Sequence, residues 1–232
     1  LASSTAVLTE TEKELGVVFA DIGAGTIDLC VYLDGAVAYS TVLPVGARNI
    51  TNDLAIGLRI SLESAEKIKL LLNQKNQDPV MPREFELNDK KDKIRNQLND
   101  EIDLSELHLS EGLSKVSRKT LIDGIIKPRL TEIFTMIALE IKKSGFAGLT
   151  PAGIIITGGG ANTLGLTDAA KRNLAMQVRI GTPSNITGLI DEIIQPNFAN
   201  GVGLVLYASK TTTVTREKFS FGSIGKLMEK IP

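Results

Sequence analysis

The sequence predicts an α/β fold in which a mixed sheet is flanked by helices. Two short and almost wholly apolar segments, 16–22 and 153–157, each run directly into a glycine-rich turn. Such runs are typical of strands that are covered on both faces. Between them, apolar residues recur at helical spacing over 50–72 and 120–145, as in helices that pack one face against a sheet.

The N-terminal part predicts three strands in succession, at 16–22, 27–33 and 36–43, where apolar residues dominate. A tight glycine-rich loop separates the first two. Asp34 and Gly35 separate the last two, and this pair suits the positive φ angles of a two-residue hairpin turn.

Two helices are expected next, over 50–60 and 61–72. Ser61 is the predicted N-cap of the second helix, and Glu63 places an acid in its first turn.

From 73 to 119 the composition shifts to a dense mixture of charges, which predicts a small, solvated subdomain of mixed α/β structure. It contains the only histidine, His108. Because a lone histidine without a second His or a Cys nearby seldom binds a metal, we interpret His108 as a surface or packing residue.

Helical periodicity returns over 120–145, with an apolar face made of Ile122, Ile126, Leu130, Phe134, Ile137 and Ile141. Pro128 lies inside this pattern, so it either kinks the helix or marks the start of its main body. Lys142, Lys143 and Gly145 are typical of a helix C-terminus. The remaining elements are a strand, a helix, a strand and a helix, expected at 153–157, 166–176, 178–180 and 198–210.

Composition excludes several classes of protein. The 26 basic and 27 acidic residues nearly cancel, and no basic stripe is visible, so nucleic-acid binding is disfavoured. The single cysteine, Cys30, lies in an apolar strand and is interpreted as a buried inert thiol, as fits a reducing cytoplasm. No apolar run approaches the roughly 20 residues of a membrane-spanning helix. Without an initiator Met or a signal-peptide pattern, the chain is expected to be a piece of a longer protein.

The two glycine-rich turns, 23–25 and 158–160, stand at the ends of buried strands. Glycines at such a place either only turn the chain or let backbone N–H groups approach an anion. The first turn lacks the lysine of a P-loop and precedes a strand, so neither the P-loop nor the Rossmann fingerprint applies. Asp21 is the group that could approach Mg²⁺, through water.

At this point the residues carry a family resemblance. The stretch "DIGAGTID" resembles the second phosphate loop of the actin, sugar-kinase and heat-shock chaperone ATPase superfamily, and "ITGGGANTLGL" resembles its adenosine loop. The stretches "LPVGARNITNDLAIGLRISLESAEKIK", "IIKPRLTEIF" and "GTPSNITGLIDEIIQPNFANGVGLVLYA" are similar to the bacterial FtsA cell-division family. The similarity covers nearly the whole chain apart from the charged segment, and it implies an actin-like (ribonuclease H-like) ATPase lobe.

The resemblance implies a site for ATP and Mg²⁺. Asp21 would lie near the metal. The β- and γ-phosphates would be wrapped by Gly23, Ala24, Gly25 and Thr26. Glu66 and Lys69 would face the ribose and adenine, although without the resemblance they read as ordinary charges on a helix surface. The adenosine would be backed by Gly158, Gly159, Gly160 and Ala161.

Two residues depart from the family's usual "DIGGGTTD". Ala24 replaces the middle glycine, which requires a negative φ at that position. Ile27 replaces the second threonine and removes a hydroxyl, so the family's Mg²⁺ geometry and hydrolysis rate do not carry over to this chain by resemblance.

The family closes two lobes over ATP, and this chain resembles only the second lobe. Its residues 1–72 and 120–210 would form the core of that lobe, with 1–15 as the tail of the segment between the lobes. Residues 73–119 would be the inserted smaller subdomain, which in FtsA-like proteins receives the C-terminal peptide of FtsZ. Because the first lobe's phosphate loop is not among these residues, we expect the chain alone to bind ATP weakly or not at all and not to turn it over.

The C-terminal segment 211–232 is either a linker or the start of an amphipathic tail. Its apolar residues at helical spacing are Ile224, Leu227, Met228 and Ile231. FtsA-like proteins end in an amphipathic helix that binds the inner face of the cytoplasmic membrane.

Three functions remain open. The favoured one is an actin-like ATP-binding protein that polymerises and links FtsZ filaments to the membrane at the division site. The others are an FtsA-related pilus-assembly scaffold and a small-molecule kinase of the same superfamily, and the sequence does not decide whether the chain is an enzyme.

Overall fold

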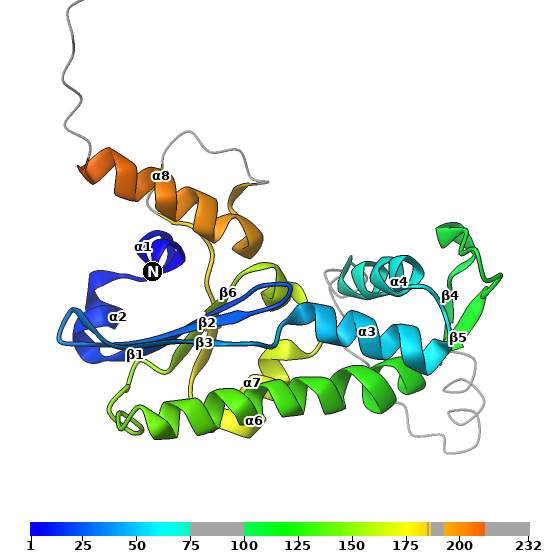
Figure 1. Ribbon diagram of the computed structural model, residues 1–232, viewed down its shortest axis with the longest axis horizontal. Helices are drawn as coiled ribbons and strands as arrows, with labels where there is room; N and C mark the ends of the chain where they lie inside the picture. Colours follow the sequence, from blue (N-terminus) through cyan, green and yellow to red (C-terminus); the bar gives the residue numbers. More distant parts are fainter. Residues whose placement is uncertain (75–99, 185, 187–192, 212–232) are drawn as a thin grey trace, which may run out of the picture.

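The computed structural model describes residues 1–74, 100–184, 186 and 193–211. Within these ranges, a five-stranded sheet has the strand order β3-β2-β1-β6-β7. The sheet is flanked by helices, as the sequence predicts (Figure 1). Its strands are β1 (Val17–Ile22), β2 (Ile27–Leu33), β3 (Ala36–Leu43), β6 (Ile154–Thr157) and β7 (Val178–Ile180).

The sheet is mixed. β1, β2 and β3 are joined antiparallel, whereas β6 pairs parallel with both β1 and β7. Asp34 and Gly35 form the turn between β2 and β3 with φ angles of 51° and 79°, which confirms the predicted hairpin. All four residues of β6 are buried, as expected for a strand covered on both faces.

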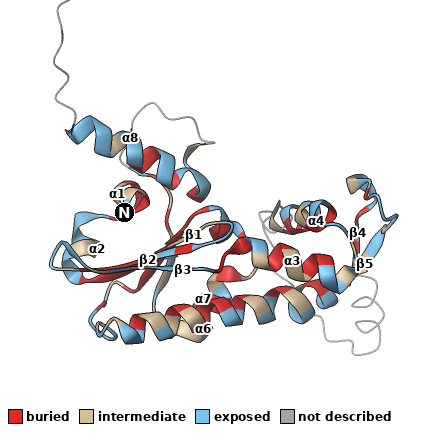
Figure 2. Ribbon diagram, in the orientation of Figure 1, coloured by how far each residue is buried: buried red, intermediate tan, exposed pale blue. Residues whose placement is uncertain are grey.

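Helices cover both faces of this sheet (Figure 1). On one face lie α1 (Ala2–Val7) and α8 (Ala199–Thr211), which pack against each other, and on the other lie α6 (Lys127–Lys143) and α7 (Leu166–Leu174). The buried residues separate in the same way into two clusters, with Phe19 in the cluster beside α8 and Phe134 in the cluster beneath α6. Figure 2 shows the buried residues along the inward faces of these helices.

Pro128 marks the start of the main α-helical body in this part of the chain, the second of the two predicted alternatives. It is the second residue of α6, and the preceding segment, η2 (Thr120–Ile126), is a π-helix. The Lys127 N–H still donates to the Ile122 carbonyl in the π pattern, so the change from π to α pattern falls at the proline, which has no N–H to donate. At the other end, Gly145 follows α6 with a φ of 81° and donates its N–H to the Lys142 carbonyl, which confirms the C-terminal signal.

Two further helices extend beyond the end of the sheet, α3 (Ala47–Leu58) and α4 (Leu62–Gln74) (Figure 1). The Ser64 N–H donates to Ser61 Oγ at 3.2 Å, so Ser61 caps α4 as predicted. Beside α4 lies a two-stranded sheet of β4 (Glu101–Asp103) and β5 (Lys115–Ser117), which enclose the short η1 (Ser105–Leu107). This is the described part of the expected 73–119 subdomain, and residues 75–99 of that prediction lie outside the described residues.

His108 is exposed at the end of η1. The expected C-terminal segment, from residue 212 on, also lies outside the described residues. In the part of the chain that is described, none of the helices has both the length and the apolar character needed to cross a bilayer.

No helix is predicted for residues 1–15, yet two short ones form there. In α2 (Glu10–Leu15), Thr9 Oγ1 accepts the Glu12 N–H and the Glu12 carboxylate accepts the Thr9 N–H. This reciprocal cap is a readable sequence pattern. The helix α1 has no such cap, and its six residues bury Ser3 and Ser4 together with Ala6 and Val7, which is too short and too mixed a pattern to read as an amphipathic helix.

Candidate functional site

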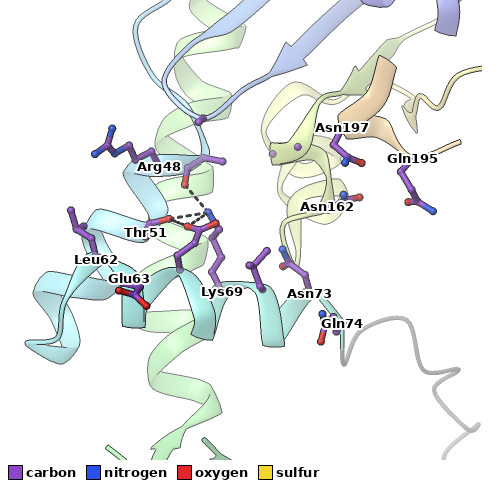
Figure 3. Close-up of a pocket in the computed structure, with 16 residues that line it drawn as sticks. Arg48, Thr51, Leu62, Glu63, Lys69, Asn73, Gln74, Asn162, Gln195 and Asn197 are labelled. Atoms are coloured by element: carbon purple, nitrogen blue, oxygen red, sulfur yellow. Dashed lines mark hydrogen bonds and ion pairs between the residues drawn. The ribbon is translucent and has the colours of Figure 1, made fainter. Parts of the chain in front are cut away.

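A cleft with a cavity volume of about 680 Å³ lies between α3 and α4 on one side and the turn after β6 on the other (Figure 3). This volume is in the range of small-molecule sites. The lining residues come from the β1–β2 loop, from α3 and α4, and from segments 159–162 and 195–197: Ala24, Ala47, Arg48, Thr51, Leu62, Glu63, Glu66, Lys69, Leu70, Asn73, Gln74, Gly159, Gly160, Asn162, Gln195 and Asn197.

The β1–β2 loop is held by the first turn of α3. Within the loop, the Gly23 N–H donates to the Thr26 carbonyl at 2.9 Å. The N–H groups of Ala47 and Arg48 donate to the carbonyls of Gly23 and Ala24 at 2.9 and 2.8 Å. The first N–H groups of a helix have no partner within the helix, and here the loop carbonyls supply one.

Ala24 does not have a positive φ. An alanine can therefore replace the usual glycine at this position, as the sequence analysis requires. The approach of α3 to the loop is close. A side chain at Gly46 would bring its Cβ to 2.5 Å from the Ala24 carbonyl oxygen, which explains the glycine there.

The α4 side of the cleft carries an ion pair. Lys69 Nζ lies 2.7 Å from Glu66 Oε2, and Thr51 Oγ1 donates to the same oxygen at 2.5 Å. Partial burial acts to raise the pKa of Glu66, but the hydrogen bonds from Lys69 and Thr51 outweigh it and lower that pKa below its usual value. Glu66 is therefore an anion at neutral pH.

The turn after β6 packs directly on the end of β1. Gly158 has a φ of 85°, and a Cβ there would meet the Ile22 carbonyl oxygen at 2.6 Å. At Gly160 a Cβ would lie 2.8 Å from the same oxygen. The residues that follow form η3 (Gly159–Asn162), and this side of the cleft adds the amide groups of Asn162, Gln195 and Asn197 (Figure 3).

Asp21 lies outside this cleft. It lines a second cavity of about 190 Å³ with Ser3, Asp28, Cys30 and Asn200 among its neighbours. Ser3 Oγ donates to Asp21 Oδ2. Burial raises the pKa of Asp21, and Asp28, its direct neighbour across the β1–β2 ladder, raises it further. No group of three or more His, Cys, Asp or Glu suited to a metal occurs among residues 1–74, 100–184 and 193–211.

Comparison with known proteins identifies the family. The family model described as "Cell division protein FtsA" matches residues 18–203. The chain belongs to the FtsA family. FtsA of Pseudomonas aeruginosa is 33% identical over 214 residues, which cover 89% of this chain and 45% of that protein. The chain thus spans about half the length of the FtsA proteins that it matches.

Solved structures confirm the actin-like fold of this FtsA-family chain. MreB5 of Spiroplasma citri bound to ADP superposes with a TM-score of 0.60 and 17% identity over 99% of this chain and 60% of that one. A PilM–PilN type IV pilus biogenesis complex gives a TM-score of 0.57 and 17% identity over 85% of this chain and 47% of that one. At this identity the likeness concerns the fold alone.

The structure brings together part of the site that the FtsA resemblance implies. Five of the predicted residues line the cleft: Ala24, Glu66, Lys69, Gly159 and Gly160. The others are not among the lining residues: Asp21, Gly23, Gly25, Thr26, Gly158 and Ala161. Gly23, Gly25 and Thr26 belong to the loop that carries Ala24, whereas Gly158 and Ala161 flank the two lining glycines.

Sequence reasoning missed several lining residues. Asn162 directly follows the predicted Ala161 and could have been included. Thr51 and Asn197 carry no local signal, since only the packing of α3 and of segment 195–197 around the cleft brings them there.

Proposed function

We propose that the chain is the second, nucleotide-binding lobe of an actin-like cell-division protein, which binds ATP with Mg²⁺, polymerises, and links FtsZ filaments to the cytoplasmic membrane. The observation that carries the proposal is the cleft, which gathers Ala24, Glu66 and Gly159 from three distant parts of an FtsA-family chain.

The chemistry of the cleft suits a nucleotide. The Glu66 side chain is 44% exposed and ionised, so it can accept hydrogen bonds from ribose hydroxyls. Gly159 and Gly160 present backbone without side chains, against which a flat adenosine can lie. The β1–β2 loop would cradle the phosphates with its backbone N–H groups.

Asp21 and Asp28 fit a role in holding Mg²⁺. Mg²⁺ is commonly bound by one or two carboxylates together with water and substrate phosphates. Burial, and after it the negative charge of Asp28, raise the pKa of Asp21, and a cation beside the carboxylate would favour its ionised form. When bound, Mg²⁺ would neutralise charge on the phosphates, and Asp21 would orient its water ligands.

Nucleotide binding can be tested by saturation-transfer-difference NMR with millimolar ATP and Mg²⁺ on this chain. We expect signals from the adenine and ribose protons, and their loss in Gly159→Val. A Cβ at Gly159 has no neighbour closer than Asn197 Cβ at 3.9 Å, so the valine enters the cleft without straining the fold. Gly201→Val on α8, where a Cβ meets nothing within 4 Å, is the matched control. Equal signals in both variants would contradict the proposal.

The FtsZ contact is proposed in the 73–119 subdomain by family position. Binding of a labelled FtsZ C-terminal peptide, measured by fluorescence anisotropy, should be saturable and weaker in Lys115→Glu, whose side chain is 66% exposed. Lys142→Glu on α6 is the control. Without binding to a folded chain, the pilus-scaffold and kinase functions would move ahead of division.

Membrane attachment at the division site is proposed for the full-length protein through an amphipathic segment after residue 211. Co-sedimentation of that protein with anionic vesicles, lost when the segment is deleted, is the expected result. Filaments seen by electron microscopy with ATP would support polymerisation.

A further inference from the structure

The ammonium group of Lys69 is enclosed by protein although the residue borders the cleft. Its side chain is only 8% exposed. Nζ lies 2.7 Å from Glu66 Oε2, 2.8 Å from Thr51 Oγ1 and 3.5 Å from the Ala47 carbonyl oxygen (Figure 3). A lysine ammonium has three N–H donors, so these three acceptors match its whole donor capacity.

Thr51 completes the arrangement. The residue is 4% exposed, and its hydroxyl both accepts from Lys69 and donates to Glu66 Oε2 at 2.5 Å. Both functions of the hydroxyl are thus used. The two donors converge on a single carboxylate oxygen, Oε2, and the other oxygen, Oε1, takes no part in these bonds.

The same turn of α3 reaches the β1–β2 loop. Ala47 accepts from Lys69 with its carbonyl and donates its N–H to the Gly23 carbonyl. Its neighbour Arg48 donates to the Ala24 carbonyl. One turn of helix therefore lies between the loop and Lys69, with hydrogen bonds on both sides.

From these contacts we propose that Thr51 and Lys69 are positioning residues, which fix Glu66 and tie it through the first turn of α3 to the β1–β2 loop. The nucleoside end and the phosphate end of the cleft then form one hydrogen-bonded unit. This inference rests on the proposed function for its ligand, a ribonucleoside di- or triphosphate. Lys69 acts through Glu66 and Ala47, which its ammonium group contacts at 2.7 and 3.5 Å.

The test uses Thr51→Val, which keeps the shape of the side chain and removes the hydroxyl. Amide hydrogen exchange of the ligand-free chain, followed by NMR, reports on the Ala47 and Arg48 N–H groups. We expect Thr51→Val to accelerate their exchange about tenfold, the effect of losing one to two net hydrogen bonds. Amides of β1 should not change.

Two further variants serve as matched controls. Thr51→Ser retains the hydroxyl and should restore slow exchange. Thr135→Val removes a threonine hydroxyl from an exposed site on α6, where it donates only to the Thr131 carbonyl, and should leave Ala47 and Arg48 unaffected. If Thr51→Val does not fold, Lys69→Met tests the other half of the arrangement, because it removes the contacts of Lys69 with Glu66, Thr51 and Ala47 and leaves the bond from Thr51 to Glu66 in place.

A second measurement separates this inference from the proposed function. ADP binding is followed by saturation-transfer-difference NMR, and Thr51→Val should weaken it at least fivefold while Thr51→Ser does not. Faster exchange in Thr51→Val, together with no ADP binding to the wild type, would uphold the positioning role and reject nucleotide binding. Unchanged exchange at Ala47 and Arg48 in both Thr51→Val and Lys69→Met would overturn the inference, whatever ADP does.

Discussion

Gly158 is a position where a single methyl group should damage the fold for two separate reasons. Its φ of 85° and ψ of 170° lie in a region that is essentially restricted to glycine, where other residues lose about 1–3 kcal/mol. The added Cβ would also lie 2.6 Å from the Ile22 carbonyl oxygen, and it would meet the Asp21 carboxylate as well. Backbone cannot move aside as a flexible side chain does, so overpacking adds about 1–3 kcal/mol. Gly158→Ala should therefore cost about 2–6 kcal/mol.

Two other glycines serve as references, one with the backbone cost alone and one with neither cost. Gly165 has a φ of 79° and a ψ of 2° but nothing within 4 Å of a Cβ, so Gly165→Ala should lose only the left-handed backbone cost, about 1–2 kcal/mol. Gly159 has neither a positive φ nor a Cβ contact below 3.9 Å, and Gly159→Ala should stay within about 0.5 kcal/mol. Urea unfolding followed by far-UV circular dichroism measures all three. The reasoning fails if Gly158→Ala loses no more than Gly165→Ala, or if Gly159→Ala loses as much as Gly158→Ala.

Three further predictions concern stability. Phe134→Ala, at a fully buried site, should lower the free energy of unfolding by about 3–5 kcal/mol in the same urea assay, and a loss below 1 kcal/mol would show that the core is not packed around this ring. Arg129→Lys should lower the free energy of unfolding by about 1 kcal/mol, because the guanidinium donates to both carboxylate oxygens of Asp53 at 2.5 and 2.9 Å and a lysine cannot make this two-point contact. Asp53→Asn, measured in parallel, should show a similar loss. Hydrogen bonds from the Ser61 N–H and then from the Ser64 hydroxyl lower the pKa of Glu111 from 4.5 to about 2. The ionised Glu111 therefore stabilises the fold above pH 4.5, and this contribution is lost as the pH falls toward 2. Over that pH range the urea midpoint of the wild type should drop toward the midpoint of Glu111→Gln.

The sequence predicted the fold where local signals agree with tertiary packing. The three N-terminal strands and β6 were visible as apolar runs, and Pro128 was placed correctly as one of two alternatives. The helix α1 was not predicted, because its burial depends on α8, which is distant in the chain. At Gly203 of α8 a Cβ would lie 3.1 Å from the Ser3 backbone nitrogen, so part of the contact is a close approach of two backbones that no local pattern in α1 announces.

The candidate site divides in the same way. A contiguous motif led to Gly159 and Gly160, because neighbouring residues of one turn reach the cleft together. The family resemblance led to Glu66 and Lys69, but it did not show that the carboxylate is partly exposed while the ammonium is enclosed. That distinction depends on Thr51, which α3 contributes.

Ala24, which replaces a glycine usual in the family, and the hydroxyl of Thr51 both bear on how firmly the cleft is held in place. A loop with alanine at its centre has less conformational freedom than one with three glycines, and its carbonyls are further held by Ala47 and Arg48. Pre-ordering of this kind lowers the entropic cost of binding a ligand. A nucleotide that enters this cleft would therefore meet a phosphate end already fixed in place. The binding energy at Glu66 would then depend on the same hydrogen bonds that hold the loop, which makes Thr51 the position where both ends of the cleft can be loosened by one change.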